Sequence, residues 1–137
     1  MKRVTGIGGI FFKSKNPAKI QQWYQKHLGI GPARSGAIMF EWISKASGKA
    51  GCTVWSPFDR KTKYFRPSSK EFMFNYRVRN LPALLKQLRR ERVRIVGTMQ
   101  EYDFGKFGWI MDPEGNKIEL WEPVDADRRK RGKRGKR

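Results

Sequence analysis

The residue of this sequence best suited to chemistry is one carboxylate near the carboxyl end. Glu119 stands between Ile118 and Leu120 in the segment KIELW. Successive side chains of a β-strand point to opposite faces, so the two aliphatic residues share one face and Glu119 lies on the other. If the aliphatic face packs against a helix, Glu119 faces the side of the sheet where a ligand can bind.

Three roles are open for Glu119. As a general base it can remove a proton next to a carbonyl group, in a site that we expect Trp121, Trp109 and Phe107 to shield from water. As a binding group it can pair with a ligand amine. Alternatively it can pair with a lysine or arginine of the same face, since the chain has 31 such residues.

Strands and helices that could position Glu119 follow from hydrophobic periodicity and capping residues. Asn16 with Pro17 predicts a helix start, Gly29 its end, and Asn80 a second helix start. The first helix carries an apolar stripe that includes Trp23, and we expect that stripe to lie in the core. Strands are expected at 4–13, 37–43, 51–56, 72–80, 93–103, 106–111 and 116–121.

The order of these elements repeats along the chain. Asn16 and Asn80 stand 64 residues apart, and each caps a helix that follows a strand and precedes further short strands. The repeat predicts an α+β fold of two βαβββ modules, at about 4–58 and 71–123, within one domain at 1–127. The polar segment 59–70 is the expected linker.

The duplicated pattern, the helix end WYQKHLGI and the hairpin DPEGNKIEL together resemble the glyoxalase, bleomycin-resistance and extradiol-dioxygenase superfamily, also called the vicinal oxygen chelate superfamily. The resemblance covers residues 4–123, and the segments GIGGIFFKSKNP, TVWSPF and TKYF are similar to one glyoxalase-like subgroup. It implies a curved mixed sheet that forms a cup, with helices outside and a ligand, often a metal, inside.

The resemblance implies a metal-ligand role for the position of Glu119, but the other ligand positions differ. They fall at Gly8 or Gly9, near Met73, and near Val54 or Trp55, where no side chain binds a cation. The one histidine, His27, is on a helix, and zinc, nickel and iron sites of this type use imidazole. We therefore expect no metal and no other cofactor. Within the cup we expect Glu119 as the catalytic candidate, with Trp55, Trp109, Trp121 and Glu41 lining the ligand space.

Charge is the outlier of the composition. The 31 basic residues face 12 acidic ones, a net charge of +19, and without the eight basic residues of 128–137 the balance is 23 to 12, still +11. Such an excess favours an anionic partner and disfavours capture of a cationic antibiotic. We expect RNA or a ribonucleoprotein to bind a basic surface and a disordered basic tail: Lys86, Arg89, Arg90, Arg92, Arg94, Arg128, Arg129, Lys130, Arg131, Lys133, Arg134, Lys136 and Arg137.

The remaining composition is typical of a folded cytoplasmic protein. Hydrophobic residues make up 38% of the chain, Cys52 is the only cysteine, and no apolar run is long enough to span a bilayer. We expect a protein without a membrane segment, and the composition allows a homodimer. The sequence favours a glyoxalase-like binding protein with an incomplete metal site and RNA as partner. The alternative is a lyase or isomerase of the same superfamily that uses Glu119 as general base or residual metal ligand.

Overall fold

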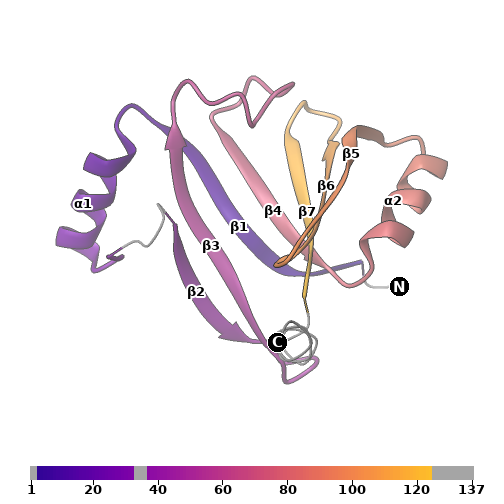
Figure 1. Cartoon of the computed structure of the whole chain (residues 1–137), viewed down its shortest axis with the longest axis horizontal. Helices are drawn as coiled ribbons and strands as arrows, with labels where there is room; N and C mark the ends of the chain where they lie inside the picture. Colours follow the sequence, from indigo (N-terminus) through magenta and orange to yellow (C-terminus); the bar gives the residue numbers. More distant parts are fainter. Residues whose placement is uncertain (1–2, 33–36, 125–137) are drawn as a thin grey trace, which may run out of the picture.

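A computed structural model describes residues 3–32 and 37–124 of the chain. Seven strands form one sheet in the order β2-β3-β1-β4-β7-β6-β5. Helix α1 lies near the β2 end of the sheet and helix α2 near the β5 end (Figure 1). The elements are β1 Val4–Ser14, α1 Pro17–Leu28, β2 Ile38–Ile43, β3 Ala50–Asp59, β4 Phe72–Val78, α2 Leu81–Arg90, β5 Arg94–Tyr102, β6 Gly105–Met111 and β7 Lys117–Pro123.

The α+β class, the curved mixed sheet and the outer helices are confirmed. The two modules differ by one strand within the described residues, because the first has the order βαββ and the second βαβββ. Where a fourth strand of the first module would lie, residues 60–71 form turns and bends. The basic residues expected at 128–137 lie outside the described residues, and neither described helix has the length and apolarity needed to cross a lipid bilayer.

The modules meet through β1 and β4, which pair antiparallel with Phe11 opposite Met73. On its other side β4 pairs parallel with β7, which places Asn75 beside Glu119. Strand β6 then pairs antiparallel with β7 and places Trp109 opposite Glu119. The centre of the sheet therefore brings Asn75, Glu119 and Trp109 side by side.

Both helices begin with the predicted asparagine caps. The Asn16 side chain accepts a hydrogen bond from the Lys19 backbone N–H at 3.1 Å, and Asn80 accepts one from Ala83 at 3.2 Å. Each cap satisfies a backbone donor that the first helical turn leaves free.

The two faces of the sheet have separate apolar clusters. On the face covered by α2, the buried residues Val78, Leu81, Leu85, Leu88 and Leu120 form the larger cluster. On the face of Glu119, Phe11, Phe65 and Met73 form the other. Phe65 comes from the 60–71 segment, so this connector folds over the Glu119 face and closes one part of the cup.

The expectation that the stripe of α1 lies in the core is wrong. No residue of α1 is buried; Trp23 is 50% and Leu28 61% exposed. Trp23 instead packs against Tyr24 and His27 of its own helix, at ring-centroid distances of 5.1 and 4.9 Å. The apolar spacing predicted the helix correctly, but the sheet on which α1 lies buries little of its apolar stripe.

Candidate functional site

Glu119 is a buried carboxylate held by three neutral donors. Its side chain is 3% exposed. Oε1 accepts a hydrogen bond from Asn75 Nδ2 at 2.7 Å, and Oε2 accepts one from Trp109 Nε1 at 2.9 Å and another from the Tyr64 hydroxyl. Donors of this kind compensate part of the solvation that an ionised carboxylate loses on burial.

The three donors come from different parts of the fold. Asn75 and Trp109 are fixed by strand register on β4 and β6, next to β7. Tyr64 comes from the connector, where its ring stacks on Phe58 with the centroids 5.8 Å apart and the planes at 16°. Tyr64 is 39% exposed and is the only one of the three donors outside a strand. It therefore lies between Glu119 and solvent.

Within the described residues, no lysine or arginine nitrogen lies within 4.0 Å of Glu119, so the third of the open roles, pairing with a cation of the same face, does not occur there. The neighbouring Lys117 donates through Nζ to the Tyr64 carbonyl at 2.6 Å and lies over the rings of Tyr64 and Trp109. Burial lowers the pKa of Lys117, and the charge of Glu119 opposes that shift. Lys117 thus contributes positive potential without neutralising the carboxylate directly.

The Tyr64 hydroxyl keeps its proton over the working pH range. Burial raises its pKa, and the negative charge of Glu119 and the hydrogen bond between them raise it further. The site therefore contains a proton-acceptor group next to a hydroxyl that acts as a donor.

The metal site that the resemblance implies does not fit these residues. Gly8 has no side chain to offer, and a Cβ there would lie 2.1 Å from Asn75 Oδ1. Among the described residues, no three His, Cys, Asp or Glu side chains gather as a ligand set. Both oxygens of Glu119 accept hydrogen bonds from N–H or O–H donors, which is the pattern of a hydrogen-bonded carboxylate and not of a metal ligand. Asn75 Oδ1 is buried without a partner in the described part of the chain.

Of the four residues expected in the cup, two lie on the face of Glu119 and two do not contribute to the site. Trp109 donates a hydrogen bond to Glu119. Trp121 follows Glu119 by two residues on β7, so it lies on the same face, where it stacks on Phe107. Trp55 is a correction: its ring contacts Phe12 and Tyr24, on the face covered by α1. Its position in β3 has the opposite parity to Val54, which packs on the Glu119 face.

Glu41 is also a correction. It is exposed on β2, the edge strand of the first module, and three strands lie between β2 and β7 in the sheet. It joins none of the contacts of Glu119.

Sequence reasoning missed Tyr64, Asn75 and Arg77. The last two stand at alternate positions of the apolar strand FMFNYRV, and strand parity places them on one face. Two polar residues on one side of a buried strand were a usable signal. Tyr64 had none, because a turn-rich connector has no periodicity from which to predict where its side chains point.

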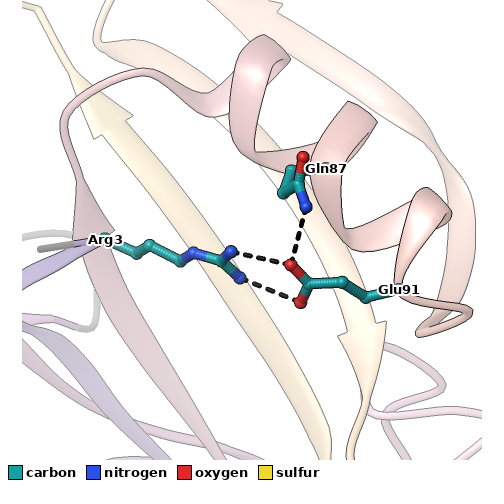
Figure 2. Close-up of polar contacts among 3 residues, drawn as sticks. All are labelled: Arg3, Gln87 and Glu91. Carbon is teal, nitrogen blue, oxygen red and sulfur yellow. Dashed lines mark hydrogen bonds and ion pairs between the residues drawn. The ribbon is translucent and has the colours of Figure 1, made fainter. Parts of the chain in front are cut away.

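The expected basic surface is exposed around α2 and the start of β5. Lys86, Arg89, Arg90, Arg92 and Arg94 are all exposed. The one acidic residue among them, Glu91, accepts hydrogen bonds from Arg3, at 2.7 and 3.0 Å, and from Gln87 at 2.9 Å (Figure 2). The Arg3 pair lowers the pKa of Glu91 to about 2, so this acid stays ionised and paired.

Solved structures share this fold at low sequence identity. A methylmalonyl-CoA epimerase from Mycobacterium tuberculosis is 20% identical over 91% of this chain and 92% of its own, with a TM-score of 0.58. One from Streptomyces coelicolor, in complex with 2-nitronate-propionyl-CoA, is 13% identical over 89% and 99%, with a TM-score of 0.64. A chain described as NAD-dependent benzaldehyde dehydrogenase from Legionella pneumophila is 19% identical over 85% and 98%, with a TM-score of 0.57.

No family model matches the sequence, and no curated protein matches it. The structural neighbours include vicinal oxygen chelate enzymes, and this chain shares its overall fold with them over most of its length. The chain therefore has the fold of the vicinal oxygen chelate (glyoxalase and bleomycin-resistance) superfamily.

Proposed function

We propose that this protein is a small-molecule enzyme of the isomerase or lyase type, with Glu119 as the base that removes a proton from a carbon next to a carbonyl group. One observation carries the proposal: a carboxylate that is 3% exposed is held by three neutral side chains and by no cation in the described residues. A buried charge without a direct ion pair is costly, and proteins keep such groups mainly where they act.

The side chains around Glu119 suit such a reaction. Glu119 takes the proton, and the electron pair of the broken C–H bond moves to the carbonyl oxygen to form an enolate. The Tyr64 hydroxyl, whose raised pKa keeps it protonated, donates a hydrogen bond to that oxygen. Glu119 then releases its proton to water, and protonation of the enolate carbon from the opposite face gives the isomer, whereas protonation from the same face restores the starting compound. Tyr64 must turn away from Glu119 to admit the substrate, and its place on the connector rather than on a strand allows this.

The epimerases among the structural neighbours are compatible with this reaction type, although identities of 13–20% extend to the fold alone. The finer statement, a base at Glu119, rests on the geometry of this chain.

The test is exchange of carbon-bound protons with D₂O, followed by NMR on 2-oxobutanoate, whose C3 protons are acidified by the adjacent carbonyl. Glu119→Gln should lower the enzyme-dependent exchange about 10²- to 10⁴-fold, the usual contribution of a general base. Tyr64→Phe should lower it less. Glu114→Gln, at an exposed carboxylate of the turn before β7, is the control and should exchange like the unmodified protein. Unchanged exchange in a folded Glu119→Gln protein would refute the base role.

A second candidate function, RNA binding, is favoured by one observation. Five basic side chains on and after α2 are exposed, while the acid between them is paired with Arg3. We propose structured RNA as the probe, with affinity measured by fluorescence anisotropy at two salt concentrations. Each phosphate neutralised adds about −0.9 to the log–log salt slope for a duplex.

Two variants locate that binding. Arg89→Glu with Arg90→Glu should weaken it and flatten the salt slope if the surface of α2 takes part, and a chain ending at Asp127 tests the contribution of 128–137. Affinity that survives both changes would exclude these residues as the RNA site.

A further inference from the structure

A second charged group lies on the Glu119 face of β4. Arg77 follows Asn75 by two residues, so both side chains point to the same side of the sheet, and Arg77 pairs with Trp121 as Asn75 pairs with Glu119. At about 3.3 Å per residue, the two strand positions are ~6.6 Å apart. The cup therefore has a carboxylate at one level and a guanidinium at the next.

Two indole rings hold the Arg77 guanidinium. Its Cζ atom lies 5.4 Å from the ring centroid of Trp42 and 5.0 Å from that of Trp121. Each indole is fixed by its own N–H: Trp42 Nε1 donates to Thr53 Oγ1 at 2.9 Å, and Trp121 Nε1 donates to the Phe104 carbonyl at 3.2 Å. The guanidinium thus has a defined position rather than the mobility of a surface arginine.

Glycines make room for this arrangement. A Cβ on Gly51 would lie 2.4 Å from a ring atom of Trp42, and one on Gly6 would lie 2.9 Å from the same ring. Both positions need the missing side chain for Trp42 to lie where it meets Arg77.

Within the described residues, the guanidinium keeps unused donors. Arg77 Nη1 reaches the Cys52 carbonyl at 3.4 Å and the Cys52 Sγ at 3.9 Å, both long contacts. In 3–32 and 37–124 no carboxylate oxygen lies within 4.0 Å of it. Burial lowers the pKa of Arg77, and this partly desolvated cation has no counter-ion among the described residues. An arginine has five N–H donors in a planar fork, which matches a carboxylate in two parallel hydrogen bonds.

We infer that Arg77 binds a carboxylate group of the substrate, so that the carbon to be deprotonated is presented to Glu119. The inference rests on the proposed function, and it names the substrate class as a small carboxylic acid with a carbonyl group and an acidic C–H bond. The spacing of the two strand positions suits an acid of a few carbon atoms, and the aromatic walls favour an apolar remainder over a further charge.

The test separates binding from turnover. Ligand-observed NMR titrations compare 2-oxobutanoate with its neutral amide, 2-oxobutanamide, which has the same carbon skeleton. The unmodified protein should bind the acid at least about tenfold more tightly, as a charge-assisted pair of hydrogen bonds implies. Arg77→Gln should remove this preference, and Arg60→Gln, at an exposed arginine after β3, should keep it.

Equal binding of acid and amide, a preference that persists in Arg77→Gln, or no saturable binding of either probe would overturn the inference. If Arg77→Gln fails to fold, Arg77→Lys decides: it keeps the charge but not the fork, and an unchanged preference would also overturn the inference.

Glu119→Gln distinguishes this inference from the proposed function. It should lose proton exchange and keep the preference for the acid. An Arg77-dependent preference without exchange in any variant supports the binding site and refutes the base role. Glu119-dependent exchange without a preference for the acid supports the base role and refutes the binding site at Arg77.

Discussion

Helices α1 and α2 have similar sequence patterns and very different attachments to the sheet. Both start at an asparagine cap with a proline in the first turn, and both carry an apolar stripe. In α2, Leu81, Leu85 and Leu88 are buried against the sheet, whereas in α1 no residue is buried. A helical pattern in the sequence therefore predicts that a helix forms, but how deeply the helix is buried depends on the part of the sheet against which it packs.

The difference matters for the candidate site. Asn75, Trp109 and Glu119 lie on β4, β6 and β7, three of the strands whose other face contributes to the apolar cluster of α2. Gly108 of β6 allows this packing, since a Cβ there would lie 3.0 Å from Leu85 Cδ1. The better-packed module thus fixes the three strand residues, whereas the first module contributes the space at Gly8 and the Phe58 ring on which Tyr64 stacks.

The largest expected effect contrasts one leucine from each helix. Leu85→Ala should lower the free energy of unfolding by about 2–5 kcal/mol, because it leaves a cavity in the main core. Leu28→Ala should change it by less than about 0.5 kcal/mol, because Leu28 is exposed. Urea unfolding followed by tryptophan fluorescence measures both. Equal losses would show that α1 packs more tightly than described above.

Two glycines offer a smaller contrast. Gly8→Ala should cost about 1–3 kcal/mol, because the added methyl group would meet Asn75 Oδ1, and Asn75 is held against Glu119. Gly108→Ala should cost less, since its neighbour is the flexible end of Leu85. Thermal unfolding of both variants ranks them, and a harmless Gly8→Ala would mean that Asn75 moves freely.

A residue in the left-handed conformation follows each helix, and it is a glycine after α1 but an arginine after α2. Gly29 follows α1 with φ 69°, and Arg92 takes the same left-handed conformation after α2 with φ 64°. Arg92→Gly should stabilise the protein by about 1 kcal/mol, and Gly29→Ala should destabilise it by about as much. The denaturation midpoints of the two variants should therefore move in opposite directions.

The smallest effect concerns the pair between Arg3 and Glu91 (Figure 2). Glu91 has a pKa of about 2 in the folded protein against an ordinary value of 4.5. A lowered carboxyl pKa contributes stability above pH 4.5, and that contribution is lost as the pH falls through this window toward 2. Arg3→Gln should therefore flatten the acid-induced loss of stability between these values. Both side chains are exposed, so the change is small, and parallel acid titrations of the two proteins would contradict it.

Much of the fold could be predicted from the sequence because its signals are local. Asn16, Pro17 and Asn80 satisfy or avoid the backbone donors of a first helical turn, and they mark both helices correctly. The period-two pattern around Glu119 placed its side chain opposite the aliphatic residues, and Ile118 and Leu120 do pack on the face of α2.

The rest of the site depends on contacts that are distant in sequence. Tyr64 reaches Glu119 across 55 residues of chain, and no local pattern encodes that contact. Trp55 was assigned to the wrong face because an isolated aromatic on a strand has two possible directions, and only the register with β1 decides between them.

The connector has a consequence for how this fold can change. Residues 60–71 join the two modules, and the same segment places Tyr64 against Glu119. The length of this segment therefore determines both how the modules are connected and how Glu119 is shielded. Lengthening the turn at 44–49, between β2 and β3, would leave the contacts of Glu119 unchanged, whereas adding or removing a residue in 60–71 would reshape the entrance to this carboxylate. New ligand preferences could therefore arise by insertions and deletions in the connector, without any substitution in the core.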